Sequence, residues 1–180
     1  MALIHLPVAQ HATIPWKNGL GMSQVIAGEP QDARYDTLLW QVGSTAFNMD
    51  CPFSELTGLD RIFMVIDGPG VELTCIDDDD STRMARVEPL RPYAFKGDWK
   101  TTCRRLGGAV RVLNVVTRRG QAEATVEFTQ ERTLKKAKDE TLVAVRLDNL
   151  DAWVLSDASV IAELPAAAGH VMVARIRMNR

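Results

Sequence analysis

The chain has 180 residues, of which 46% are hydrophobic and 24% charged, as is typical of one globular domain or two small lobes that share a core. Its 21 Lys and Arg residues against 23 Asp and Glu residues leave a net charge of −2, which gives no field that attracts nucleic acid or anionic lipid. No apolar run approaches the roughly 20 residues of a membrane helix, and the N-terminus has no signal-peptide pattern. The three cysteines (Cys51, Cys75 and Cys103) form no CxxC pair or disulfide framework, so we expect a protein of the reducing cytoplasm that binds neither membrane nor nucleic acid.

The predicted elements are nearly all short strands. Residues 62–66 are an apolar run, residues 71–76 alternate, and the turn Asp67-Gly68-Pro69-Gly70 between them predicts a β-hairpin. The next turn, Asp77 to Asp80, is expected to be solvated, because four consecutive aspartates lack the alternating ligands of a calcium loop. Further strands are predicted at residues 101–106, 109–119, 124–129, 141–147, 153–155, 160–164 and 170–176.

This pattern of strands favours a two-lobed β protein. No window shows helical periodicity, and many short strands at near-regular spacing are typical of a sandwich or barrel. We expect an N-terminal lobe of residues 1–120 and a C-terminal lobe of residues 121–180, packed as one unit because no flexible linker separates them. The charged segment 131–140 is expected to be a surface loop, with Lys135, Lys136 and Lys138 in solvent rather than in a nucleic-acid patch.

Metal binding and covalent catalysis have little support in the sequence. His5, His11 and His170 are not paired at the spacing of metal ligands, so we predict no metal. There is no GxSxG, no P-loop and no complete dinucleotide fingerprint, so we predict no cofactor and no catalytic residue. Cys75 and Cys103 lie within strands as small hydrophobic residues, which leaves Cys51 as the cysteine expected to be exposed.

Three sets of polar residues stand in apolar or glycine-rich contexts. The segment from Ile14 to Ser23 is either one wall of a pocket or an edge strand with a turn, and its spacing alone favours the second interpretation. Arg61 precedes a buried strand, where it either binds a carboxylate ligand or pairs locally with an acid. Asn114 and Arg118 share one face of a strand, where they either line a barrel interior together or bond to neighbouring backbone.

Six segments, in this order, resemble the HutD/Ves family. They are Pro15-Trp16-Lys17-Asn18-Gly19-x-Gly21, Trp40-Gln41-Val42-x-Ser44-x-Ala46, Asp50-x-Pro52-Phe53-Ser54, Gly58-x-Asp60-Arg61, Phe95-x-Gly97-Asp98 and Asn114-x-x-x-Arg118-Arg119. The resemblance covers residues 14–120 and implies an all-β bicupin: two packed cupin-like β-barrel lobes in one chain, without the His-rich metal motif of cupin enzymes. The chain departs from the family pattern at Leu20, which interrupts a run of glycines, at Gln41, which replaces an Arg, and at Cys51, which replaces a Gly.

The resemblance implies binding of a small carboxylate metabolite, such as N-formylglutamate or urocanate, in the regulation of histidine utilisation or in a stress response. We expect the positive charge of the site to come from Lys17, Arg61 and Arg118. We expect polar groups of Asn18, Gln41, Ser44 and Asn114 to orient the ligand, and Trp16 with Phe53 to cover its apolar part.

Two alternatives remain open at this point. A metal-independent cupin isomerase or epimerase would need a general acid and base, for which Lys17, Asp60, Asp98 and Tyr93 are the candidates. A protein-interaction module would use open sheet edges to pair two copies, so a homodimer is compatible with either function.

Overall fold

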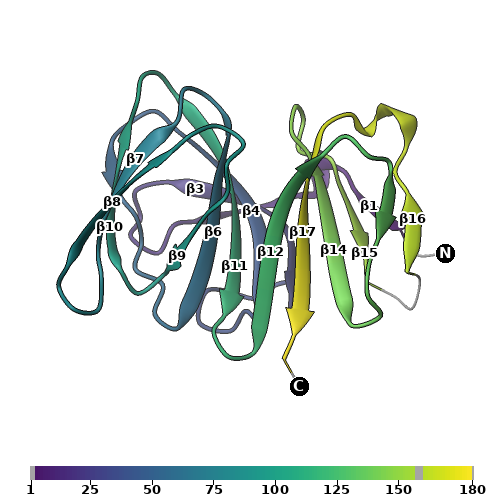
Figure 1. Ribbon diagram of the computed structural model, residues 1–180, viewed down its shortest axis with the longest axis horizontal. Helices are drawn as coiled ribbons and strands as arrows, with labels where there is room; N and C mark the ends of the chain where they lie inside the picture. The colour runs from purple at the N-terminus through teal and green to yellow at the C-terminus, as the bar shows by residue number, and fades with distance from the viewer. Residues whose placement is uncertain (1–2, 157–159, 180) are drawn as a thin grey trace.

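The computed structural model describes residues 3–156 and 160–179, which form two β lobes side by side (Figure 1). The only helices in these residues are the short 3-10 turns η1 (Val8–Gln10) and η2 (Ala166–Ala168). No helix in this part of the chain is long and apolar enough to cross a membrane. The prediction of an all-β chain is therefore confirmed.

The N-terminal lobe is built from two antiparallel sheets. The six-stranded sheet has the order β2-β3-β4-β11-β6-β9, with β2 at Ala12–Pro15, β3 at Met22–Glu29, β4 at Trp40–Phe47, β11 at Val110–Arg118, β6 at Leu59–Asp67 and β9 at Tyr93–Lys96. The four-stranded sheet has the order β5-β10-β7-β8, with β5 at Cys51–Pro52, β10 at Lys100–Arg105, β7 at Val71–Ile76 and β8 at Thr82–Val87.

The C-terminal lobe contains a five-stranded sheet and a two-stranded one. The larger sheet has the order β1-β15-β14-β17-β12, with β1 at Leu3–Leu6, β15 at Ala152–Leu155, β14 at Glu140–Arg146, β17 at Val171–Met178 and β12 at Ala122–Thr129. The smaller sheet pairs β13 (Thr133–Lys135) with β16 (Ile161–Glu163). The first strand of the chain thus belongs to this lobe, because β1 pairs with β15, whereas the change of lobe near Gly120 lies between β11 and β12.

Strand β11 lies where the two lobes meet, and its alternating side chains divide between two cores. Val110 and Val112 pack inside the N-terminal lobe together with residues of β6 and β7. Leu113 and Val115 point the other way, into a core shared with strands β14 and β17 of the C-terminal lobe. Because successive strand residues face opposite sides, one strand lines the inside of the first lobe and also joins it to the second.

The predicted hairpin of residues 62–66 and 71–76 is wrong, although both strands exist. Strand β6 pairs with β11 and β9, whereas β7 pairs with β10 and β8, so the intervening turn carries the chain from one sheet to the other. Gly68 and Gly70 have positive φ angles of 97° and 102°. A Cβ atom on Gly68 would lie 2.5 Å from the carbonyl oxygen of Ala109, so this turn is packed against neighbouring backbone. Turn chemistry alone predicts the reversal of the chain but does not choose the pairing partner.

Three side chains that were expected at the surface are buried. Asp77 accepts hydrogen bonds from two backbone N–H groups of its own turn and from Nε of Arg83 at 2.6 Å, and this satisfies its carboxylate without solvent. Lys136 is only 7% exposed and donates to the carbonyl oxygen of Ala137 at 3.1 Å. Cys51 is buried in β5, and burial raises the pKa of its thiol.

Candidate functional site

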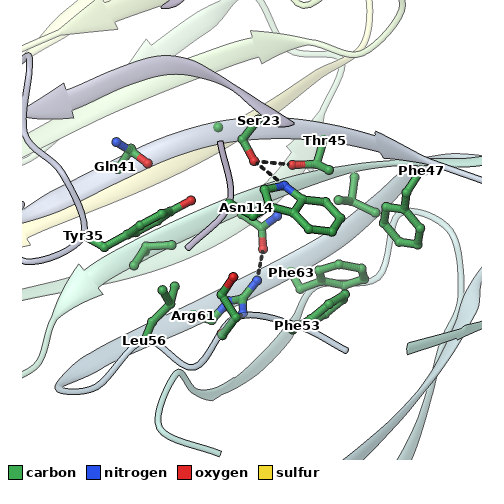
Figure 2. Close-up of a pocket in the computed structure, with 15 residues that line it drawn as sticks. Ser23, Tyr35, Gln41, Thr45, Phe47, Phe53, Leu56, Arg61, Phe63 and Asn114 are labelled. Carbon is green, nitrogen blue, oxygen red and sulfur yellow. Dashed lines mark hydrogen bonds between the residues drawn. The ribbon is translucent and has the colours of Figure 1, made fainter. Parts of the chain in front are cut away.

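A pocket opens into the N-terminal lobe beside the six-stranded sheet, with a cavity volume of about 50 Å³ (Figure 2). Strands β4, β6 and β11 form its floor, and the loops that carry Trp16, Tyr35 and Phe53 form its walls. Aromatic and aliphatic side chains make up much of the lining, and a few polar groups converge among them, as is usual for ligand pockets.

The floor of the pocket follows directly from strand register. Asn114 on β11 lies opposite Gly43 on β4 and Phe63 on β6, and Val116 lies opposite Gln41 and Arg61. Arg61 and Asn114 are therefore diagonal neighbours on the same face, close enough for side-chain contact. Nη2 of Arg61 donates to Oδ1 of Asn114 at 3.2 Å, as Figure 2 shows.

The guanidinium of Arg61 is the charged group of this pocket, and it is poorly satisfied. Its second hydrogen bond, to the carbonyl oxygen of Ser54, is long at 3.5 Å, and its buried Nε has no acceptor among the described residues. It lies 5.0 Å from the ring centre of Phe53 and 5.1 Å from that of Phe95, within the range of cation–π contact. Burial lowers the pKa of Arg61 to about 10, so the side chain remains a cation at neutral pH.

The Trp16 loop is held by a short chain of hydrogen bonds. Nε1 of Trp16 donates to Oγ of Ser23 at 3.0 Å, and this hydroxyl also lies 2.6 Å from Oγ1 of Thr45 (Figure 2). A Cβ atom at Gly21 would lie 2.8 Å from the indole ring, so the absence of a side chain there makes room for Trp16. The indole therefore has a fixed position at the wall of the pocket.

Asn18 ties the Trp16 loop to the segment that carries Phe53. Its Nδ2 donates to the carbonyl oxygen of Pro52 at 3.1 Å, and its backbone N–H donates to Oγ of Ser54, also at 3.1 Å. Its Oδ1 accepts from the backbone N–H of Leu20 at 3.1 Å, which closes the turn. Asn18 thus acts on the arrangement of two pocket walls, from outside the pocket.

Of the nine predicted ligand-binding residues, five line the pocket and four do not. The five are Trp16, Gln41, Phe53, Arg61 and Asn114. Lys17 and Asn18 lie outside it and are exposed. Ser44 is buried, but it lies three residues from Gln41 on β4, so its side chain points to the opposite face of the strand. Arg118 donates instead to the carbonyl oxygens of Leu38 and Tyr35. The three predicted cations therefore do not converge, because only Arg61 reaches the pocket.

Several lining residues were missed by the sequence reasoning. Thr45 and Phe47 follow from Gln41 by simple alternation along β4, and Phe63 follows from Arg61 along β6, so the strand period contained that signal. Tyr35 comes from a loop without any periodic pattern, so its place at the site could not be predicted from the sequence.

The donor set of the pocket does not suit a metal ion. Among the described residues that line it there is no Asp, Glu, His or Cys. Elsewhere in the described part of the chain, no three such side chains come together in a way that could hold a metal. Amide, hydroxyl, indole and guanidinium groups are instead suited to hydrogen bonding with a polar or anionic molecule.

The carboxylates considered for acid–base chemistry are engaged in a structural ion-pair cluster. Nη2 of Arg119 lies 2.7 Å from a carboxylate oxygen of Asp60 and 2.7 Å from one of Asp98. Asp98 also accepts from the backbone N–H of Gly58 at 3.0 Å, and these bonds lower its pKa despite the opposing effect of burial. Much of the Gly58-x-Asp60-Arg61 and Phe95-x-Gly97-Asp98 pattern therefore has a structural role: it holds together the segments around residues 58–60 and 97–98.

Comparisons with known proteins agree with the fold and identify the family. A Pseudomonas putida protein described as an "uncharacterized 21.2 kDa protein in hutC 3'region" is 30% identical over 117 residues, which is 64% of this chain and 59% of that protein's length. The structure of HutD from Pseudomonas fluorescens SBW25 superposes with a TM-score of 0.79 at 19% identity, covering 99% of this chain and 100% of that one.

More distant structures share the fold alone. Oxalate decarboxylase from Bacillus subtilis superposes with a TM-score of 0.56 at 5% identity, covering 99% of this chain and 78% of that chain. These similarities support a cupin-like β fold. The family model for HutD matches residues 8–174, nearly the whole chain, and confirms the resemblance found in the sequence motifs: the chain belongs to the HutD family.

Proposed function

We propose that this protein binds a small carboxylate metabolite in the pocket of its N-terminal lobe, with Arg61 as the anchor of the anion. The observation that carries this proposal is the state of the Arg61 guanidinium. It is a cation without a carboxylate partner among the described residues. It makes one hydrogen bond of ordinary length, to Asn114, and one long hydrogen bond, to the carbonyl oxygen of Ser54, and its Nε–H is unused. A guanidinium normally presents five N–H donors, and a carboxylate is the acceptor that matches its geometry best.

The size of the cavity limits how a ligand enters. A volume of about 50 Å³ is well below the roughly 300–1,000 Å³ of pockets that enclose a whole drug-sized molecule. We propose that a carboxylate group enters the cavity, and that the rest of the metabolite lies toward the mouth near Trp16 and Phe53. N-Formylglutamate and urocanate both have a carboxylate that is able to enter in this way.

The biological context of the proposal comes from the family. The name of the Pseudomonas putida relative places that protein beside hutC. We propose by analogy that ligand binding here serves the regulation of histidine utilisation or a stress response rather than turnover of the ligand.

Thermal unfolding in the presence of small acids tests this function. The probes are acetate, N-formylglutamate and urocanate, with acetamide as an uncharged control. A ligand at about 100 times its dissociation constant adds about 2.7 kcal/mol of stability, which raises the Tm of a chain this size by several degrees. We expect a rise with at least one of the acids, none with acetamide, and none in Arg61→Gln.

The matched control is Arg86→Gln, because Arg86 is exposed, lies outside the pocket and is paired with Glu88 at 2.6 Å. This variant should keep the full response to the acids. Equal responses in wild type and Arg61→Gln, or no response of the wild type to any of the acids, would refute the proposal.

The alternative of a metal-independent cupin enzyme has no specific observation in its favour. Asp60 and Asp98 are bonded to Arg119, and neither Lys17 nor Tyr93 lines the pocket. The titratable side chains that do line it, among the described residues, are those of Arg61 and Tyr35.

A further inference from the structure

The loop of residues 30–39 forms one wall of the pocket, and it is held mainly through its own carbonyl groups. It connects β3 to β4 and closes with a hydrogen bond from the N–H of Leu39 to the carbonyl oxygen of Glu29 at 2.7 Å. Nε and Nη2 of Arg118 donate to the carbonyl oxygens of Leu38 at 2.8 Å and Tyr35 at 3.1 Å. Two donors from one rigid guanidinium plane thereby fix two points of the loop.

The side chain that this loop delivers to the pocket is Tyr35. The ring packs against the buried cluster of Leu38, Leu56, Leu59 and Val116 in the N-terminal lobe. Figure 2 shows its hydroxyl pointing toward the middle of the pocket, on the side of Ser23 and Asn114. Burial raises the pKa of Tyr35, and the nearby charge of Arg61 opposes this only in part, so the phenol remains protonated and able to donate.

Arg118 itself does not reach the cavity. It has no ion pair with a carboxylate in the described part of the chain, and it lies behind the loop, with its side-chain bonds going to loop backbone. Any effect of Arg118 on ligand binding must therefore pass through the position of the loop. Its backbone N–H also donates to the carbonyl oxygen of Leu39 at 2.7 Å, so strand and loop are fixed together.

We propose that the Tyr35 hydroxyl is a second hydrogen-bond donor to the bound carboxylate, beside Arg61, and that Arg118 is the positioning residue that holds Tyr35 in place. This inference rests on the proposed function of the pocket. A carboxylate has two oxygen atoms, and a guanidinium and a neutral phenol on different walls satisfy both without adding a second positive charge. The arrangement favours an acid over its amide, because only the acid brings a negative charge to the Arg61 guanidinium.

A double-mutant cycle tests this inference, with acetate as the probe and affinity measured by calorimetric titration. Tyr35→Phe should weaken acetate binding about tenfold, as expected for a lost hydrogen bond to a charged acceptor. Arg118→Ala should weaken it by a similar factor, and the double variant should bind no more weakly than the weaker single variant. Coupling of this kind is expected only if Arg118 acts through Tyr35. If the loss of acetate affinity in the double variant equals the product of the two single losses, Arg118 does not act through Tyr35 and the positioning role is wrong. Unchanged affinity in Tyr35→Phe would overturn the inference as a whole.

Two further variants separate positioning from general loss of stability. Arg132→Ala removes a similar bond, from Nε to the carbonyl oxygen of Leu164 at 3.1 Å, in the other lobe, and should leave acetate affinity unchanged. Arg118→Lys, which restores one donor, should recover part of the affinity, and it takes the place of Arg118→Ala in the cycle if the latter fails to fold. If wild type binds acetate and Arg61→Gln does not, the proposed function stands whatever the cycle gives. If wild type does not bind acetate but binds another of the acids, the same double-mutant cycle is measured with that acid.

Discussion

Replacing Arg61 with methionine is expected to make the ligand-free protein more stable. Burial lowers the pKa of this guanidinium well below its ordinary value, to about 10, because the charged form has lost much of its water. A shift of that size corresponds to about 3 kcal/mol. For a base whose pKa is lowered by folding, this cost is present in full below pH 10 and fades as the pH rises toward the unfolded value. At pH 7 the folded protein therefore carries the whole cost.

Favourable contacts of Arg61 offset part of this cost. Its two cation–π contacts, with Phe53 at 5.0 Å and Phe95 at 5.1 Å, contribute about 0.5–1 kcal/mol each. Its hydrogen bond to Asn114 contributes about 1 kcal/mol. Methionine is uncharged, and its sulfur packs well against aromatic rings. The expected net gain in Arg61→Met is at most about 1 kcal/mol, which corresponds to at most about 2–4 °C in Tm for a chain of this size.

Scanning calorimetry and urea unfolding at pH 7, both without ligand, measure this gain. Arg61→Lys is the matched control: an ammonium is more strongly hydrated than a guanidinium, so burying it should bring no gain. The same Arg61→Met protein should give no Tm response to acetate. If Arg61→Met is less stable than wild type by 1 kcal/mol or more, Arg61 is a structural residue and the reasoning above is wrong.

Two predictions concern the Trp16 wall of the pocket and the ion-pair cluster around Arg119. Gly21→Ala should cost about 1–2 kcal/mol by urea unfolding, because its Cβ would lie 2.8 Å from the indole of Trp16. Gly108→Ala, where nothing lies within 4 Å, should change stability far less, and equal losses would contradict the explanation. Arg119→Gln should cost about 1–2 kcal/mol at pH 7, since Arg119 bridges two carboxylates. Because the pKa of Asp98 is lowered by folding, this difference should shrink as the pH falls through that pKa; a difference that stays constant down to pH 3 would argue against the ion-pair cluster.

The sequence predicts strands well here and sheet pairing poorly. Alternation is a local property, so residues 71–76 and 109–119 could be assigned as strands from their own side chains. Pairing depends on distant segments. The turn between β6 and β7 has the composition of a hairpin, yet each strand pairs with strands of a different sheet. Nothing in residues 67–70 encodes that difference.

The site could be predicted only where a single residue was conspicuous in its own context. Arg61 before an apolar run and Asn114 among valines were recognised in this way, and both line the pocket. On β4 the sequence could not choose between Gln41 and Ser44, because both faces of this strand are buried, one by the first lobe and one by the second. Arg118 was assigned to the ligand because it shares a strand face with Asn114 and carries a positive charge. Its side-chain bonds go instead to loop carbonyls that no sequence pattern reveals.

Strand β11 contributes to both the pocket and the contact between the lobes. Asn114 faces the pocket, while its neighbours Leu113 and Val115 pack in the core that the two lobes share. A substitution that shrinks Leu113 or Val115 leaves a cavity in the core between the lobes, into which the backbone of β11 can relax. Such a shift would also move Asn114, on the opposite face, and Arg61, which is hydrogen-bonded to it. The shape of this pocket and the packing of the two lobes are therefore coupled: a substitution that alters one also alters the other, because both depend on the backbone of β11.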